Sequence, residues 1–248
     1  MTETGKLGFI GGFELDTTKG KIAGFEEAAK FVGEQEGKTV ELLNVPYTNS
    51  FSDAPKGKEF ATELIAQGAD VFFGDASAVN SGAREAIDAA NAASGSVKIF
   101  DIAQPADILG QNECIICSQV TDNSAMVVAS MQAVEAGSFG GEVLYGTMQN
   151  GALSAGKISD LVPADVQEKY LAYVDQMIAG TFMQLAKQQL DPKRGDHSSE
   201  WSPTFFCIAP YSSENAANRH KTSCVKTHHE TWQNAVHEVF CASFPVAP

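Results

Sequence analysis

The stretch APKGKEFATELIAQGADVFFGD, residues 54–75, joins an amphipathic segment to a short apolar run. In the first part, Phe60, Leu64 and Ile65 recur at helical spacing, and Gly68 follows just past the end of the segment, as a helix C-terminal glycine does. The second part, ADVFFGD, carries the unbroken apolar run that is typical of a strand buried on both faces. The stretch therefore predicts a helix followed directly by a buried strand.

The same alternation runs through residues 1–145. Helical patterns cover residues 17–35, 80–94 and 123–137, the last of them ending at Gly137. Further segments that we predict as strands are KLGFIGG (6–12), KTVELLNVPYT (38–48), VKIFDIAQ (97–104), ECIICSQV (113–120) and GGEVLYGT (140–147). Apolar strands separated by helices predict an α/β fold with a mainly parallel sheet and helices on both faces.

In sheets of this kind, ligands bind beyond the carboxyl ends of the strands. The segments predicted at that edge are Gly11–Phe13, Tyr47–Phe51, Gly74–Ala78 and Asp101–Gln104. Phe51 lies in a polar turn, where its ring can stack on a planar ligand or can pack down onto the sheet. Asp101 is predicted at the end of a strand, where it can accept sugar hydroxyls or act as a helix N-cap or a solvated loop residue.

Composition and charge exclude several classes of partner. The 248 residues carry a formal net charge of −14, which argues against nucleic acid or an anionic membrane surface as a partner and is otherwise explained by solubility. The sequence has no apolar run of about 18 residues, so we expect no membrane span. The first residues, MTETGKLGFIGG, lack the pattern of a signal peptide, and the chain as written is expected in the cytoplasm.

The motifs favour binding over catalysis. The sequence has neither a G-x-x-x-x-G-K-[ST] phosphate loop nor a G-x-S-x-G elbow, and residues 1–183 contain no histidine. We therefore expect no enzyme activity and no cofactor. Cys114 and Cys117 form a C-x-x-C, but residues i and i+3 of a strand point to opposite faces, so we interpret them as buried core cysteines.

The chain changes character near residues 182–184. All five histidines and both tryptophans lie after residue 195. Two pairs at i, i+4 spacing, Cys224 with His228 and His237 with Cys241, are a possible zinc site. Their order matches no known zinc finger, so we favour an unselected carboxyl terminus of low order and expect no metal.

Several segments resemble the basic membrane protein family, the PnrA-like purine nucleoside receptors of ABC importers. They are residues 4–32, residues 49–73, which include the block SFSDAPKGK, and residues 151–180. The resemblance runs from about Thr4 to about Thr181, and it implies one lobe of a type I periplasmic-binding-protein fold that binds a nucleoside without catalysis. It also implies an importer permease as the partner and, for the full-length family, a periplasmic or membrane-anchored lipoprotein.

The resemblance also implies roles for individual residues. Phe51 matches an aromatic residue that stacks on the purine, and Asp101 matches an aspartate that holds ribose hydroxyls. Ser77 and Ala78 stand where the family has a Gly-Gly pair that approaches the nucleoside. Thr121 falls near the position of a lysine in the family. The implied ligand site therefore comprises Phe51, Ser77, Ala78, Asp101 and Thr121.

The resemblance implies three regions and a missing lobe. Residues 1–125 correspond to the ligand-binding carboxyl-terminal lobe, residues 126–183 to a segment that returns toward the other lobe, and residues 184–248 to a tail unlike the family. An amino-terminal lobe precedes the matched segments in the family, so we expect a truncated receptor with impaired binding. The alternative hypothesis is a cytoplasmic ligand-sensing or interaction module that dimerises through the flank exposed without that lobe.

Overall fold

The computed structural model describes residues 1–140 and 145–182, and within them the strands form one sheet. The strand order is β2-β1-β3-β4-β5-β6, in which β1 to β5 run parallel and β6 pairs antiparallel with β5. The strands are β1 (Lys6–Ile10), β2 (Glu41–Leu42), β3 (Val71–Gly74), β4 (Phe100–Ala103), β5 (Ile115–Thr121) and β6 (Leu153–Ala155). The predicted mainly parallel α/β sheet is confirmed.

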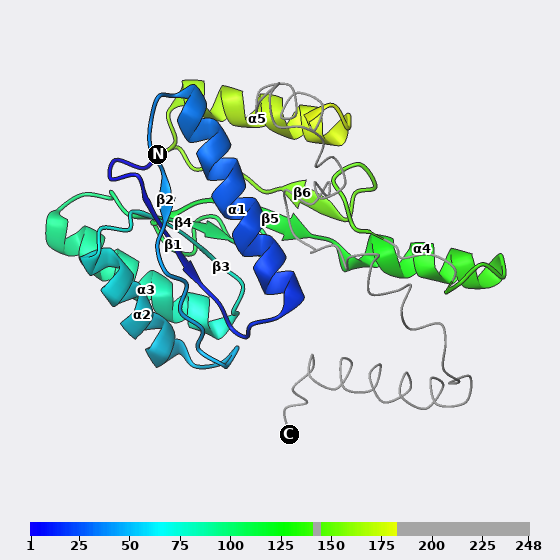
Figure 1. Ribbon diagram of the computed structural model, residues 1–248, viewed down its shortest axis with the longest axis horizontal. Coiled ribbons are helices and arrows are strands. Elements are labelled where there is room, and N and C mark those ends of the chain that lie inside the picture. The colour runs from blue at the N-terminus through cyan, green and yellow to red at the C-terminus, as the bar shows by residue number, and fades with distance from the viewer. Residues whose placement is uncertain (141–144, 183–248) are drawn as a thin grey trace, which may run out of the picture. The chain divides into compact units, whose positions relative to one another are not determined.

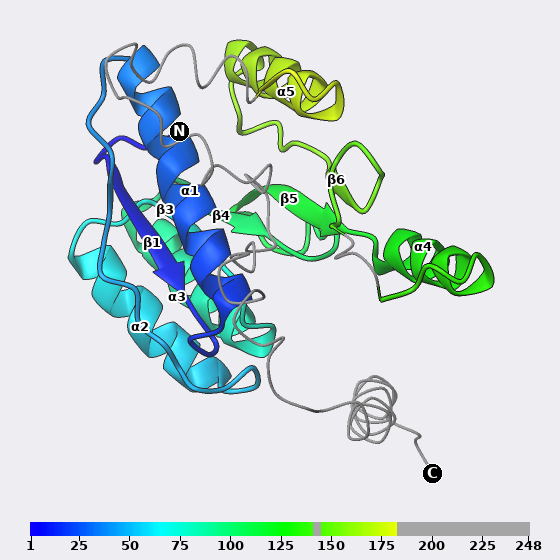
Figure 2. The same cartoon turned by 45° about the vertical axis from the view of Figure 1, so that its right-hand side comes forward.

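Helices cover both faces of the sheet, as predicted. They are α1 (Asp16–Gln35), α2 (Ala54–Ala66), α3 (Ala78–Ser94), α4 (Asn123–Glu135) and α5 (Ala164–Ile178). Figures 1 and 2 show α1 crossing one face while α2 and α3 lie side by side on the other. The two helices on that face approach closely, because Gly82 of α3 has no side chain and a Cβ there would overlap the Ala54 carbonyl oxygen.

The apolar strands supply core residues to both faces. Phe72 of β3 packs on the side of α2 and α3, where it joins Leu64 and Ile87 in one cluster. Its neighbour Phe73 points to the opposite side, where its ring lies 5.5 Å from the ring of Phe25 on α1. Because successive side chains of a strand alternate between faces, a strand that is buried on both faces must be apolar throughout.

The strand order creates a switch point between β1 and β3. The chain leaves β1 through α1 to reach β2 on one side, and it then crosses back through α2 to reach β3 on the other side of β1. Helix α1 follows β1 on one face of the sheet, and α3 follows β3 on the other face (Figure 2). The loops after β1 and β3 therefore diverge at the carboxyl edge of the sheet. Crevices at such switch points are the usual ligand sites of open α/β sheets.

Two strand predictions need correction. The segment 38–48 contains only the two-residue strand β2, followed by an isolated bridge between Gly11 and Tyr47. Of the segment 140–147, residues 141–144 lie outside the described part, and residues 145–147 are not in a strand. The strand at this end is β6, which pairs Ala155 with Gln119 and which the sequence did not single out because it is only three residues long.

The remaining predictions concern a domain boundary and residues outside the described part of the chain. The division into 1–125 and 126–183 remains a prediction. Cys224, His228, His237 and Cys241 of the possible zinc site lie outside the described residues. Across the described ranges, no helix is both long and apolar enough to cross a membrane.

Candidate functional site

Phe51 lies in the loop between β2 and α2, at the carboxyl edge of the sheet. Its side chain is 42% exposed, which is a large fraction for a phenylalanine in a folded domain. Its ring contacts the ring of Phe13 in the loop after β1, with centroids 5.0 Å apart and ring planes 62° apart. Phe13 is itself 36% exposed, so the two rings form an aromatic corner that is open to a ligand.

The backbone at Gly12 brings the ring of Phe51 close to the sheet. A Cβ at Gly12 would overlap Cε1 of Phe51, so only glycine lets the ring approach this closely. The Phe51 loop is also tied to α3, because the Ala78 amide donates a hydrogen bond of 3.0 Å to the Phe51 carbonyl. The chain thus places Phe51 next to the loops that follow β1 and β3.

Ser77 and Ala78 form the amino terminus of α3 beside Phe51. Ser77 is the exposed N-cap residue, with φ of 47° and ψ of −111°, and the Val79 amide donates a hydrogen bond of 2.9 Å to the Ala76 carbonyl. These angles match the first central position of a type II′ turn, which favours glycine. Serine therefore occupies a glycine-like backbone conformation at the edge where ligands approach.

Asp75 lies in the same β3–α3 loop, between β3 and Ser77. Its Oδ2 accepts a hydrogen bond of 2.6 Å from the hydroxyl of Thr18 on α1, and its Oδ1 accepts one of 3.4 Å from the Gly12 amide. Thr18 is fully buried, whereas Asp75 is half-buried. The carboxylate therefore joins the β1 and β3 loops at the switch point.

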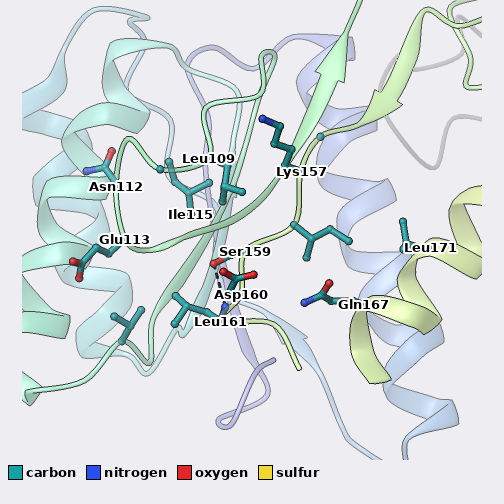
Figure 3. Close-up of a pocket in the computed structure, with 14 residues that line it drawn as sticks. Leu109, Asn112, Glu113, Ile115, Lys157, Ser159, Asp160, Leu161, Gln167 and Leu171 are labelled. Carbon is teal, nitrogen blue, oxygen red and sulfur yellow. Dashed lines mark hydrogen bonds between the residues drawn. The ribbon is translucent and has the colours of Figure 1, made fainter. Parts of the chain in front are cut away.

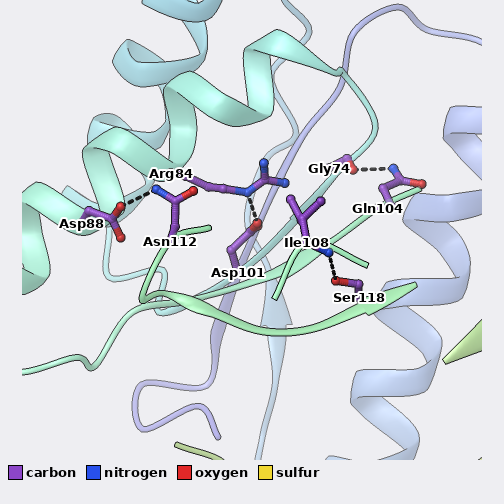
Figure 4. A network of polar contacts seen from close by, with 8 residues as sticks. All are labelled: Gly74, Arg84, Asp88, Asp101, Gln104, Ile108, Asn112 and Ser118. Carbon is purple, nitrogen blue, oxygen red and sulfur yellow. Dashed lines mark hydrogen bonds and ion pairs between the residues drawn. The ribbon is translucent and has the colours of Figure 1, made fainter. Parts of the chain in front are cut away.

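Thr121 is the last residue of β5 and lies farther along the same edge. Its amide donates a hydrogen bond of 2.8 Å to the Pro105 carbonyl, and its hydroxyl accepts one of 2.9 Å from Gln119. Gln104, which precedes Pro105, links this part of the edge to β3 through a hydrogen bond from its amide nitrogen to the Gly74 carbonyl (Figure 4). The ammonium group of Lys21 on α1 donates a hydrogen bond of 2.8 Å to the side-chain oxygen of Gln104.

Asp101 is not at the end of its strand, and that prediction is wrong. It is the second residue of β4, its side chain is 8% exposed, and its Oδ2 lies 2.7 Å from Nε of Arg84 on α3 (Figure 4). Burial raises the pKa of the Asp101 carboxyl, while the charge and hydrogen bond of Arg84 act in the opposite direction. This carboxylate is occupied inside the fold instead of facing the edge.

The two cysteines of the C-x-x-C are free thiols. Cys114 is fully buried in the cluster beneath α2 and α3, whereas Cys117 is half-buried and packs against the cluster on the other face. Burial raises the pKa of both thiols, to about 12 for Cys117. Their predicted placement on opposite faces is confirmed, and it prevents the pair from binding one metal ion. The predicted burial is right for Cys114 and wrong for Cys117. In the described ranges, no group of three or more His, Cys, Asp or Glu side chains could hold a metal.

A cavity of about 1020 Å³ lies elsewhere in the lobe (Figure 3). Its walls come from the segment before β5, the segment after β6 and helix α5, and they include Leu109, Ile115, Leu161 and Leu171. Ile115 begins β5, so the cavity reaches the amino end of that strand. None of the residues at the carboxyl edge lines it, and we place the candidate site at that edge because strand geometry and exposed aromatic groups coincide there.

Sequence reasoning identified part of this site and missed part. The structure brings Phe51, Ser77 and Ala78 together, places Thr121 along the same edge, and removes Asp101 from it. Phe13 and Asp75 lay within the predicted edge segments but carried no motif that singled them out. Thr18 was missed because it is an ordinary position within the first turn of a helix, and only its partner across the sheet distinguishes it.

Curated relatives resemble this chain at modest identity. The ABC transporter nucleoside-binding protein BmpA of Lactococcus lactis subsp. cremoris is 26% identical over 167 residues, which is 62% of this chain and 46% of the relative. Basic membrane protein A of Borreliella afzelii is 23% identical over 170 residues, 68% of this chain and 50% of the relative. The chain thus spans about half the length of these relatives.

Solved structures share the fold. A transcriptional activator of the comK gene from Bacillus halodurans superposes with a TM-score of 0.57 at 26% identity, covering 72% of this chain and 58% of that one. A solute-binding protein of an ABC transporter system from Aeropyrum pernix K1 gives a TM-score of 0.51 at 20% identity, covering 86% and 60%. The second similarity supports the fold alone.

The chain also matches the model of a protein family. A model of the family described as ABC transporter substrate-binding protein, PnrA-like, matches residues 1–183, about three quarters of the chain. This range includes every described residue and the whole carboxyl edge of the sheet. The chain therefore belongs to the family of PnrA-like substrate-binding proteins of ABC transporters.

Proposed function

We propose that this chain binds a nucleoside, with a purine base favoured, and delivers it to an ABC importer permease without catalysing a reaction. The observation that carries this proposal is the exposed ring of Phe51, held against Gly12 at the switch point of a family fold dedicated to substrate binding. An exposed aromatic ring offers a flat apolar surface on which a base can stack, contributing about 1–3 kcal/mol.

The neighbouring groups complete the proposed site. Ser77 and Ala78 present the amino terminus of α3 beside Phe51, and a helix amino terminus favours electron-rich ligand atoms. Thr121 offers a hydroxyl farther along the edge. Delivery to a permease places the protein outside the cytoplasm, which is part of the same proposal. Asp101 is left out, because its carboxylate already pairs with Arg84.

The test is titration with inosine, guanosine and adenosine. The 248-residue chain is examined by ligand-observed NMR, which detects weak binding, and by calorimetry after fusion to the unmatched half of the Lactococcus lactis relative. Binding by wild type and a loss of about tenfold or more in Phe51→Ala are expected, since stacking is removed. A folded wild-type protein that binds no nucleoside in either form contradicts the proposal.

A second candidate function is an interaction module that pairs through α4. The observation that favours it is the exposure of four apolar residues on this helix, Val127, Val128, Met131 and Val134, each more than half exposed. Contiguous exposed apolar surface commonly marks an interface. Size-exclusion chromatography with light scattering distinguishes the two candidates: a stable dimer that Met131→Glu converts to monomer favours the module, and a monomeric wild type contradicts it.

A further inference from the structure

The cavity of about 1020 Å³ beside α5 is lined by apolar side chains that remain open to solvent. We call it the α5 groove, and its walls include Leu109, Ile115, Leu161 and Leu171. Leu161 is 45% exposed and Leu171 is 48% exposed, whereas Ile115 is buried beneath them. Exposed leucines that line one cavity are a usual mark of an interaction site.

Hydrogen bonds hold the walls of the α5 groove in place. The Ser159 amide donates a hydrogen bond of 2.8 Å to the Ile116 carbonyl, so the segment after β6 is fixed along β5. The carboxylate of Asp107 accepts a hydrogen bond of 3.1 Å from the Lys157 amide and one of 3.3 Å from the Leu109 amide. This carboxylate joins two walls of the groove. A groove that is already formed costs a partner little ordering free energy.

Carboxylates surround the α5 groove. Figure 3 shows Glu113 on the side away from Leu171, with Asp160 between the two. On α5, Glu168 lies three residues before Leu171 and Asp175 four residues after it, the spacings that make neighbours on a helix surface. All four acidic residues are exposed, and none forms an ion pair within the described part of the chain.

The rim of the α5 groove is therefore negative above an apolar floor. Lys157 is the one cation that lines the groove, and the Asp107 carboxylate, which its backbone amide contacts, offsets its charge. An amphipathic helix with basic flanks complements both features, because apolar side chains at i, i+3, i+4 and i+7 enter the groove while Lys or Arg side chains reach the rim. Each helical turn, about 5.4 Å long and about 10 Å across, occupies about 420 Å³. The groove thus accepts about two turns.

We propose that the α5 groove docks a basic amphipathic helix of a partner protein. The groove lies at the amino ends of two strands, because Val97 precedes β4 and Ile115 begins β5. The candidate ligand site lies at the opposite, carboxyl edge of the sheet, so the partner can bind while a small ligand is held there. The inference goes beyond the proposed function and does not depend on it.

The test measures how a fluorescein-labelled peptide of leucine and lysine binds the full 248-residue chain, by fluorescence anisotropy. The peptide is patterned as an amphipathic helix of about 18 residues, or about five turns. The same peptide with glutamate in place of lysine and a scrambled peptide of the same composition are the probe controls. We expect binding of the patterned Leu/Lys peptide alone, weakened severalfold by high salt because charges contribute. Equal binding of all three peptides, or no binding of the patterned one, overturns the proposal.

Leu171→Glu tests the apolar wall. It places a charge where a leucine should be buried by the partner, and it should weaken binding of the Leu/Lys peptide about tenfold or more. Val32→Glu is the matched control, because Val32 is an apolar residue of α1 that is 42% exposed and does not line the groove. It should bind the peptide as wild type does. An unchanged affinity in a folded Leu171→Glu variant contradicts the proposal.

The double variant Asp160→Asn/Glu168→Gln tests the rim and keeps the fold, since both side chains are exposed. It should weaken the peptide about two- to tenfold and reduce the effect of salt. The matched control, Glu59→Gln/Glu63→Gln, removes the same charge from exposed positions of α2 outside the groove and should bind as wild type does. Equal weakening by the two double variants would show that only the net charge attracts the peptide, which overturns the proposal.

Other occupants of the α5 groove would leave their own signatures. Both tryptophans of the chain, Trp201 and Trp232, lie in residues 184–248. A change in tryptophan emission caused by Leu171→Glu without peptide would therefore assign the groove to that tail. A wild-type dimer that Leu171→Glu converts to monomer, measured by light scattering, would assign it to a second copy of the chain. Either result overturns the proposal.

Discussion

Helices α3 and α4 both follow a strand at the carboxyl edge, yet they differ in how they use their apolar residues. Eight residues of α3 are buried, among them Ile87, Arg84 and Asn91. None of the residues of α4 is buried, although valine and methionine make up much of the helix. Helix α3 packs against α2 and the sheet, whereas the apolar side chains of α4 lack comparable cover within the described residues.

The difference shows that forming a helix and burying it are separate events. Both helices were predicted from sequence, and both end at a glycine with positive φ, Gly95 after α3 and Gly137 after α4. Only α3 has its apolar residues concentrated on the face that meets the sheet. A helix that is apolar on all sides normally belongs inside a larger core. We therefore expect α3 to carry much of the stability of this lobe and α4 to carry little.

The largest expected effect comes from the ion pair between α3 and the sheet. Arg84→Met leaves the Asp101 carboxylate buried without its partner, which should lower the free energy of unfolding by about 3–5 kcal/mol at neutral pH. Urea denaturation followed by circular dichroism measures the loss. The matched change on α4, Glu135→Gln, removes an exposed charge and should alter stability by less than about 0.5 kcal/mol.

The pH dependence of the same variant sharpens this prediction. Burial raises the pKa of Asp101, and Arg84→Met removes the main opposing influence, so the pKa of Asp101 rises further. A carboxyl whose pKa is raised by folding stabilises the protein below its ordinary pKa of 3.8 and loses that contribution as pH rises through the folded-state pKa. The deficit of the variant relative to wild type should therefore be smaller in acid and grow toward neutral pH. A deficit that is constant with pH contradicts this account.

Truncation of one apolar side chain on each helix tests whether α3 is buried and α4 is exposed. Ile87→Ala on α3 removes a side chain that is fully buried in the cluster with Phe72, and it should cost about 2–5 kcal/mol. Met131→Ala on α4 removes a side chain that is 60% exposed, and it should change stability by less than about 0.5 kcal/mol. The two variants are compared by urea denaturation. A loss of several kcal/mol in Met131→Ala would show that α4 is covered in solution.

The smallest effect concerns the ends of the two helices. Ser77 precedes α3 with a φ of 47°, so Ser77→Gly should relieve backbone strain and raise stability by about 1 kcal/mol after the entropy of glycine is subtracted. Gly137 follows α4 with a φ of 69°, and Gly137→Ala should lower stability by about 1 kcal/mol. Thermal unfolding of the pair should give shifts of opposite sign. A destabilised Ser77→Gly would contradict strain at Ser77.

Much of the fold was predictable because its signals are local. Unbroken apolar runs such as residues 71–73 predict buried strands, and helical spacing with a final glycine predicts α2 and α4. Phe51 was predicted at the ligand edge because the loop after a parallel strand must lie there. The extent of the two-residue strand β2 was predicted wrongly, and the three-residue strand β6 was not predicted at all. Strands this short are defined by pairing with a neighbouring strand and not by a sequence pattern of their own.

The sequence by itself determined the α/β class, the order of most elements and the aromatic residue at the carboxyl edge. Only the tertiary structure placed the two carboxylates in different environments. Asp101 and Asp75 both belong to segments predicted at the edge, but Asp101 meets Arg84 inside the core, while Asp75 meets Thr18 and Gly12 at the switch point. The physical reason is that these partners lie 17 to 63 residues apart in the sequence and are brought together only by the order of the strands.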